Sequence, residues 1–353
     1  MEDVKNIKQR SPVDCLTTCL RPTQAQNKKN ITMMNKNSWK YLVPCLAMAL
    51  CSVAFTSCSD DDEGSTPKGL VATYNGKLPT QVGSYNFYYD DNGRCYNISS
   101  SYGDDVVNID YKKLIISTDD EEDYMHVVFN NKGYITKIYG SWNYSDGSEY
   151  ERGSGTVTFK YDGDGHLTAQ TGTSKESYSY DGEKSSYTGS GKVTCTWKGG
   201  DFVSARYEYT ETEDGKTDTE TEEYKVTYDN TLNNKTEQFP MAFTDIFGDD
   251  QYLLALVGMF GKGPAHLPEL IECKTIYGDG SSYNEQTYAE YGLNADGTID
   301  WEMLNGYRYE YSYKTYSAND DEATPAAKMT KAMQAGQKKL RVRDFFMPKR
   351  NRK

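Results

Sequence analysis

Three histidines and many carboxylates are the residues of this chain whose types could do acid–base or nucleophilic chemistry. His126 lies in a strand-like run, His166 follows the YDGDG turn, and His266 lies in the loop before Leu267-Pro268. Nothing in the sequence brings a histidine beside a serine or cysteine nucleophile, and no HExxH, GxSxG, Walker A or GxGxxG motif occurs. Carboxylates are so numerous that a glycosidase-like pair can always be imagined, so they indicate no reaction. We predict no catalytic residue and no cofactor, and we expect structural or solvated histidines.

Calcium is the one ligand to which the turns could offer several oxygen atoms. Asp162 and Asp164 stand in the turn YDGDGH, and a second turn holds Asp90, Asp91 and Asn92. Neither turn has the full calcium loop with its closing glutamate. Because hairpin-turn chemistry explains both clusters, we predict no metal and keep Asp162 and Asp164 only as weak calcium candidates.

Cys58 is the residue best placed for covalent modification. Residues 41–57 carry no charge over 17 positions, follow Lys36 and Lys40, and end in small residues just before Cys58, which is the layout of a cleaved export signal. The segment resembles a bacterial lipobox, although Phe55 replaces the aliphatic residue that is commoner there. We expect Cys58 to be acylated, to become the new N-terminus and to anchor the protein to a membrane.

Two alternatives at this junction are weaker. An uncleaved membrane helix remains open, because about 17 apolar residues is the lower limit for a span. Cys51 and Cys45 are poorer lipid acceptors, since Leu50 is bulky for a cleavage site and Pro44 would leave almost no apolar run.

An acidic tract follows the cysteine at once. It resembles the surface-export signal of Bacteroidetes lipoproteins and consists of Ser59, Asp60, Asp61, Asp62 and Glu63. We therefore expect a lipid-anchored protein of the bacterial outer membrane, exposed at the cell surface.

The charge is divided by segment. The net charge is −13 for the whole chain, but residues 1–58 carry +5 and residues 326–353 carry +9, which leaves −27 for residues 59–325. A middle region this acidic repels nucleic acid and anionic lipid, so we predict no nucleic-acid partner.

The sequence divides into five parts. Residues 1–32 are polar and lack a hydrophobic period, so they are disordered or a mis-called start, with Met33 or Met34 the more natural initiator. Residues 33–57 are the signal peptide, residues 58–71 an acidic tether, residues 72–317 a β-barrel-like domain, and residues 318–353 a basic, poorly ordered tail.

The middle region repeats one pattern, in which alternating apolar residues and an aromatic residue precede a short Asp/Asn/Gly turn. The copies are FYYDDNGRCYNI, VVFNNKGYITKI, VTFKYDGDGHLTA, VTCTWKGGDFVSA and the weaker VTYDNTLNN. Such turns need positive φ angles, so each copy predicts a β-hairpin. The glycines expected at the turns are Gly93, Gly133, Gly165 and Gly200, and the corner aromatics are Tyr89, Phe129, Tyr161, Trp197 and Tyr228.

The hairpins predict a mainly β fold, an antiparallel meander that forms a soluble barrel or a strongly curled sheet. A lipid-facing barrel is disfavoured by the strand RYEYTETE, which places Tyr207, Tyr209, Glu211 and Glu213 on one face and charged or polar residues on the other. Closure of the sheet would remove edge strands that invite aggregation.

One segment, residues 249–260 (DDQYLLALVGMF), breaks the β pattern. It is apolar almost all round, so it predicts one short buried helix, capped by Asp249 or Asp250 and stopped by Gly261 with Pro264. Its expected buried residues are Leu253, Leu254, Val257 and Phe260.

Three cysteines, Cys95, Cys195 and Cys273, remain in the mature region, where at most one disulfide could form. Their strand-like surroundings favour buried thiols over a disulfide, which the compartment would permit.

The hairpins, together with the segment MFGKGPAHLPELIECKTIY at 259–277, resemble the domain of unknown function, described as porin-like in fold, that occurs in Bacteroidetes lipoproteins. The resemblance covers residues 82–316 and implies an antiparallel barrel without an agreed activity or catalytic residue. With 31 Tyr against 11 Phe, the strand faces suit a glycan or peptide ligand. We expect a non-catalytic binding or assembly module; a structural envelope protein and a carboxylate-based hydrolase are the alternatives.

The basic tail has two interpretations. Met329, Met333 and Leu340 have roughly helical spacing among its lysines and arginines. The tail is either a poorly ordered appendage or an electrostatic arm for phosphate-bearing lipid or for the protein's own acidic barrel.

Overall fold

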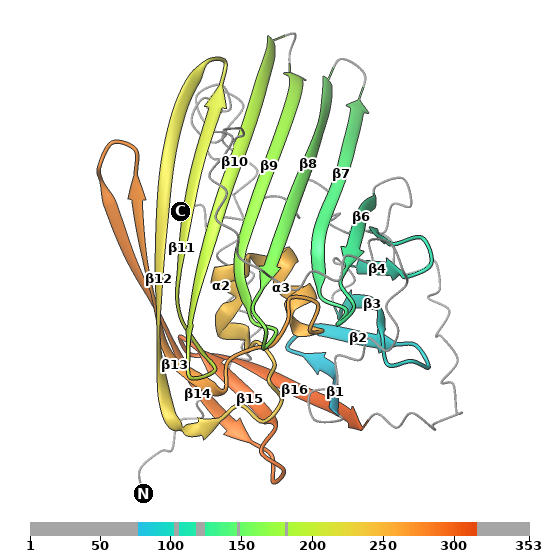
Figure 1. Ribbon diagram of the computed structural model, residues 1–353, viewed down its shortest axis with the longest axis vertical. Helices are drawn as coiled ribbons and strands as arrows, with labels where there is room; N and C mark the ends of the chain where they lie inside the picture. The colour runs from blue at the N-terminus through green and yellow to red at the C-terminus, as the bar shows by residue number, and fades with distance from the viewer. Residues whose placement is uncertain (1–76, 102–105, 118–123, 147–148, 181–182, 316–353) are drawn as a thin grey trace, which may run out of the picture. The chain divides into compact units, whose positions relative to one another are not determined.

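Sixteen antiparallel strands form one closed barrel in the computed structural model, which describes residues 77–101, 106–117, 124–146, 149–180 and 183–315 (Figure 1). Each strand pairs with its neighbours along the chain, and β1 (Lys77–Val82) closes the ring by pairing with β16 (Tyr307–Thr315). The predicted fold class, a mainly β hairpin meander closed into a barrel, is therefore confirmed.

The strands between them differ in length. In chain order they are β2 (Tyr85–Tyr89), β3 (Cys95–Ser100), β4 (Val106–Asp110), β5 (Ile115–Ser117), β6 (Tyr124–Phe129), β7 (Ile135–Asp146), β8 (Glu149–Tyr161), β9 (Leu167–Tyr180), β10 (Glu183–Lys198), β11 (Asp201–Glu213), β12 (Lys216–Asn233), β13 (His266–Tyr277), β14 (Ser282–Leu293) and β15 (Ile299–Leu304). The long strands β7–β12 rise beyond the short strands β2–β6, as Figure 1 shows.

Five hairpin turns share one hydrogen-bond pattern. In each, the first residue's N–H donates to the carbonyl four positions on, and the N–H of a glycine at the fourth position donates back to the first residue's carbonyl. The predicted Gly93, Gly133 and Gly165 hold this position with φ of 72°, 82° and 98°, which a side chain would strain. The turns span residues 90–94, 130–134, 162–166, 277–281 and 294–298. Gly200, with φ 88°, turns the β10–β11 hairpin in a different loop.

The corner aromatics bind the starts of earlier strands. The Tyr161 hydroxyl donates to the Ile135 carbonyl at 2.6 Å, and the Trp197 indole N–H donates to the Leu167 carbonyl at 2.8 Å. Tyr89 and Tyr228 donate in the same way to Pro79 and Phe202. Phe129 has no polar atom and stacks on Tyr111, whose hydroxyl reaches the Cys95 carbonyl at 3.0 Å. The four rings with a polar tip therefore fill the core while that tip satisfies a backbone carbonyl of an earlier strand.

Three short helices between β12 and β13 fill part of the barrel interior. We call residues 234–264, which contain these helices, the plug. They are η1 (Met241–Phe243), α2 (Thr244–Phe247) and α3 (Asp249–Leu256). The predicted buried residues Leu253, Leu254, Val257 and Phe260 are confirmed, with exposed fractions of 2, 0, 1 and 0 %. Phe260 stacks on Phe159 of β8 with ring centroids 4.8 Å apart.

The predicted ends of the helix were wrong. The N-cap is Gly248, without a side-chain cap bond, rather than Asp249 or Asp250. The helix ends at Leu256, before Gly261, because Gly258 takes φ 75°. The Gly258 and Met259 N–H groups donate to the carbonyls of Ala255 and Leu254, which is the Schellman pattern.

The residues that follow Phe260 at the end of the plug contact the β8–β9 turn. An added Cβ on Gly261 would lie 2.2 Å from the Gly165 carbonyl oxygen, so only glycine fits there. The Lys262 N–H donates to the same carbonyl at 3.0 Å, and its ammonium pairs with Glu237 at 3.0 Å. The plug is thus fastened to the β8–β9 turn.

The weakest hairpin copy was a wrong prediction. VTYDNTLNN does not turn back, because β12 continues to Asn233 and the chain then enters the plug. His266, expected in a loop, is instead the first residue of β13.

Alternation along the strands separates a polar outer wall from the interior. On β10 the outward positions are Thr188, Lys192, Thr194 and Thr196, all exposed, whereas Val193 and Cys195 are buried. On β11, Arg206 and Glu208 point outward between buried or half-buried Ala205, Tyr207 and Tyr209. These two strands carry no outward-facing apolar band, which is what contact with lipid would need.

Candidate functional site

The inner wall beyond the plug carries a band of glycines. Residues paired across antiparallel strands share one face of the sheet. Val157 pairs with Gly172, Gly172 with Gly191, and Gly191 with Tyr209, so a row of small residues runs across β8, β9 and β10 to an aromatic ring on β11. The next row is Gly155, Ser174, Gly189 and Glu211. Small residues therefore replace large side chains along both rows; Gly172 and Gly191 are half-buried, and Gly155 and Gly189 are buried.

A recess lies where this band meets the plug. Its cavity volume is about 30 Å³, or about 510 Å³ when all the space between the atoms and the open solvent are counted. The strands contribute the glycine band and the rings of Tyr207 and Tyr209, whose centroids lie 5.9 Å apart in a stacked arrangement. The plug contributes Ile246, Phe247 and Gln251. The Tyr207 hydroxyl donates to the Ile246 carbonyl, which holds that ring against the plug. The recess thus combines aromatic rings and amide groups, as small-ligand sites do.

Carboxylates share the inner strand faces with the recess but are not among the residues that line it. Glu176 and Glu220 point inward and are only 4 % and 7 % exposed, and Glu211 and Glu213 share the inward face with Tyr207. The hydroxyl of Tyr187 donates to Glu211 at 3.1 Å, and that of Tyr178 donates to Glu213 at 2.5 Å. Burial, reinforced by the Glu213 hydrogen bond, raises the pKa of Tyr178 to about 12.

Glu222 is an inward carboxyl with altered acidity. It pairs in register with Tyr207. Burial raises the pKa of Glu222 to about 7, the charge of Asp245 adds to the effect, and a hydrogen bond from the Tyr224 hydroxyl opposes it. A carboxyl that titrates near neutrality could exchange a proton with a ligand.

A second buried carboxyl, Glu302 of β15, belongs to the plug. It is fully buried and accepts the N–H groups of Met241 and Ala242 at 2.7 and 2.8 Å. The hydroxyls of Tyr311 and Tyr291 donate to it at 2.5 and 3.2 Å. Burial raises the pKa of Glu302 to about 7 against these four donors. Because every contact is structural, we assign Glu302 to holding the start of η1.

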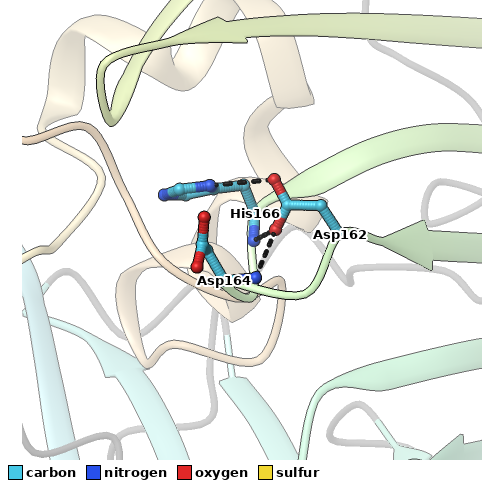
Figure 2. Close-up of side chains that lie close together, drawn as sticks. All are labelled: Asp162, Asp164 and His166. Atoms are coloured by element: carbon cyan, nitrogen blue, oxygen red, sulfur yellow. Dashed lines mark hydrogen bonds and ion pairs between the residues drawn. The ribbon is translucent and has the colours of Figure 1, made fainter. Parts of the chain in front are cut away.

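The calcium candidates form a turn. Asp162, Asp164 and His166 have ligand atoms within 4.8 Å of one another. Figure 2 shows the three side chains together at the turn. One Asp162 oxygen accepts the N–H groups of Asp164, Gly165 and His166 at 2.9–3.0 Å, and the other lies 3.0 Å from His166 Nδ1. The carboxylate is thus engaged by its own loop, as the hairpin interpretation predicts. The second turn repeats this, since Asp90 accepts the N–H groups of Asn92 and Arg94.

The other two histidines lie apart from the recess and from each other. His266 Nδ1 lies 2.9 Å from Asp201, whose second oxygen accepts the His266 N–H, so this pair ties β13 to β11. His126 stacks on Tyr139, with ring centroids 4.9 Å apart, on the outer wall of β6 and β7. The side-chain contacts described for the three histidines are with aspartate, tyrosine and tryptophan.

Among the described residues the three cysteines are free thiols. Cys95 and Cys195 are buried and Cys273 is half-buried. Burial raises the pKa of Cys95 and of Cys195 to about 12 and that of Cys273 to about 11, so these thiols are unreactive.

Comparison with known proteins finds structures but no family. No family model matches the chain, and no curated protein matches it. A porin-like protein from Bacteroides vulgatus is a similar solved structure, with 18 % identity and a TM-score of 0.43 over 68 % of this chain and 100 % of that one. A porin-like protein from Bacteroides uniformis gives 16 % and 0.41 over 70 % of this chain and 99 % of that one.

The described part of the chain contains no helix long and apolar enough to cross a membrane. Cys58, the export tract from Ser59 to Glu63, residues 1–76 and the basic tail lie outside the described residues.

Some residues of this site were predicted from the sequence. Alternation in RYEYTETE placed Tyr207, Tyr209, Glu211 and Glu213 on one face, which the structure confirms. The glycine band and Glu176, Glu220 and Glu222 were not singled out. Their signal was faint, because Gly155, Gly172 and Gly191 become neighbours only when the register is known.

Proposed function

We propose that this chain is a non-catalytic binding module of the bacterial envelope, held at the outer-membrane surface by acylated Cys58. The recess beside Tyr207 and Tyr209 carries the proposal, because two stacked rings and amide groups provide contacts for a ligand. The polar outer wall supports a barrel that stands in water and needs a separate anchor. Membership of the porin-like family of Bacteroidetes lipoproteins is part of the same proposal.

A glycan or a peptide is the ligand class that the recess fits best. Phenol rings stack on the apolar faces of sugars or on peptide side chains, while carboxylates and amides satisfy hydroxyl and N–H groups. The inward Glu211 and Glu220 favour ligands rich in donors and disfavour phosphorylated or sulfated ones.

The test is a screen of the purified full chain against host and microbial glycans and peptides. We expect saturable binding that Tyr209→Ala weakens about tenfold or more. The matched control is Tyr288→Ala, which removes an exposed ring from β14 outside the recess. Equal loss in both variants, or binding to nothing, would contradict the proposal.

A carboxylate-based hydrolase is the second candidate, and Glu222 is the observation in its favour. A pKa of about 7 suits a general acid, and the group faces the lumen beside Tyr207. Hydrolase substrates are therefore included in the screen. Turnover that Glu222→Gln abolishes would replace the binding proposal with this one.

A further inference from the structure

The inner wall beyond the plug is acidic over several strands. Inward-facing glutamates come from β8, β9, β11 and β12, and the plug adds Asp245, which accepts the Thr287 hydroxyl at 3.2 Å. At the described inward positions of β8–β12 the single basic residue is Lys216, exposed at the tip of the β11–β12 hairpin. The glutamates are Glu151, Glu176, Glu211, Glu213, Glu220 and Glu222. Such a wall attracts a cationic chain.

The same chain carries a segment of opposite charge. Residues 326–353 contain ten lysines and arginines and one aspartate, among them Lys338, Lys339, Arg341 and Arg343. The tail also contains Phe345 and Phe346, which suit the aromatic recess. Lysine and arginine gain further attraction over tyrosine rings, and the recess presents Tyr207 and Tyr209.

The length of the tail permits it to reach the lumen. β16 ends at Thr315, beside the start of β1, and 38 residues follow it. An extended chain of that length spans about 125 Å, whereas β12, the longest strand with 18 residues, spans about 60 Å. The tail can therefore pass along the full height of the wall and still have about half its length inside.

We propose that the basic tail, residues 326–353, docks in the acidic lumen of its own chain and occupies the recess that an external ligand would use. Docking requires only the acidic wall and the tail. Competition with a ligand rests on the proposed function. The tail then sets the affinity of the site and selects ligands that can displace it.

Cross-linking of the full chain tests docking directly. A carbodiimide joins a lysine amine to a glutamate carboxylate only when the two are in contact. We expect links from Lys338 and Lys339 to Glu211 and Glu220, and fewer of them in about 1 M salt, where charges are screened within about 3 Å. Links confined to Glu208 and Glu223, which face outward on the same strands, or no links from the tail, would overturn the proposal.

Proteolysis of paired variants provides a second measurement on the full chain. Glu211→Gln with Glu220→Gln should release the tail, so trypsin should remove it about tenfold faster than in the unaltered protein. The control, Glu208→Gln with Glu223→Gln, should change that rate less than about twofold. Equal rates in both pairs would contradict docking. If the inner pair lowers the melting temperature, cross-linking of the unaltered chain decides.

The two proposals can fail separately. Inner-wall cross-links without binding in the ligand screen would leave docking in place and remove the proposed function. Ligand binding that Tyr209→Ala weakens, in a chain whose tail gives no inner-wall cross-links, would leave the proposed function and remove docking.

Discussion

Two carboxylate–histidine pairs show how a residue type that suggests chemistry is used by the fold. Asp162 binds three backbone N–H groups and His166, and Asp201 binds the N–H and the ring of His266. His166 also stacks on Trp197 with ring centroids 4.3 Å apart. Each pair fixes where a strand begins, so these groups are positioned by turns rather than gathered at one site.

Calcium should leave the stability of the protein unchanged, because Asp162 already binds its own loop. Partial burial alone would raise its pKa, but the hydrogen bonds from the His166 backbone and ring hold the pKa of Asp162 below its usual value. We expect melting temperatures in millimolar calcium and in EDTA to agree within about 1 °C, since a bound ion would shift them by mass action. A rise of several degrees that Asp164→Asn abolishes would restore the metal site.

The protein should become less stable as the pH rises, because Glu302 loses its proton. Its folded pKa, about 7, lies above the ordinary value of 4.5, so its protonated form favours the folded state. That contribution is complete below pH 4.5 and is lost as the pH passes 7, an effect of about 3 kcal/mol in the free energy of unfolding. Glu222 acts in the same direction.

The check is a set of urea titrations from pH 4.5 to 8 on the unaltered protein, Glu302→Gln and the exposed control Glu310→Gln. Glu302→Gln should flatten the pH dependence, leaving the part due to Glu222, whereas Glu310→Gln should retain it. A pH dependence that is identical in all three proteins would show that Glu302 does not titrate in this range.

At the scale of elements, the plug is the part on which the barrel's core depends. Leu254 is fully buried on α3, and Phe239, Phe243 and Phe260 are fully buried around it. The hairpins and the helix were predictable because strands and buried helices leave short-range signals, namely alternation, turn glycines and an all-apolar run. Helix α2 and the Schellman ending at Gly258 were not, since the conformation of short helical turns depends on the surrounding barrel.

Leu254→Ala should lower the free energy of unfolding by about 2–5 kcal/mol, because the surrounding rings cannot collapse into the space left behind. Denaturant titration measures this, with Leu293→Ala as the control, since Leu293 is 39 % exposed at the end of β14. The control should cost less than about 0.5 kcal/mol. Equal small losses for both variants would contradict a buried plug.

At the scale of the whole molecule, the strand register brings together what the sequence keeps apart. Glu176 and Glu211 lie on β9 and β11, and Gly155 and Gly191 on β8 and β10, yet they form one wall of the lumen. Periodicity could show which residues of one strand share a face, but not which strands would be neighbours around the recess. The acidic wall therefore appeared only with the closed barrel.

Attachment of the whole molecule to the membrane through acylated Cys58 is a further prediction. Metabolic labelling with an alkyne fatty acid should modify the unaltered protein, because Cys58 follows an uncharged run with a basic lead. Cys58→Ser should lose the label, and Cys51→Ser should keep it. A label that survives Cys58→Ser would place the acceptor elsewhere.

Whether the lumen recess binds a ligand is tested by a side-by-side binding screen of the unaltered full chain, Tyr209→Ala and Tyr288→Ala on one array of glycans and peptides. We expect saturable binding of at least one ligand class that Tyr209→Ala weakens about tenfold or more and Tyr288→Ala leaves within about twofold. Binding that survives Tyr209→Ala, or that depends on Tyr288, would show that the lumen recess is not the binding site.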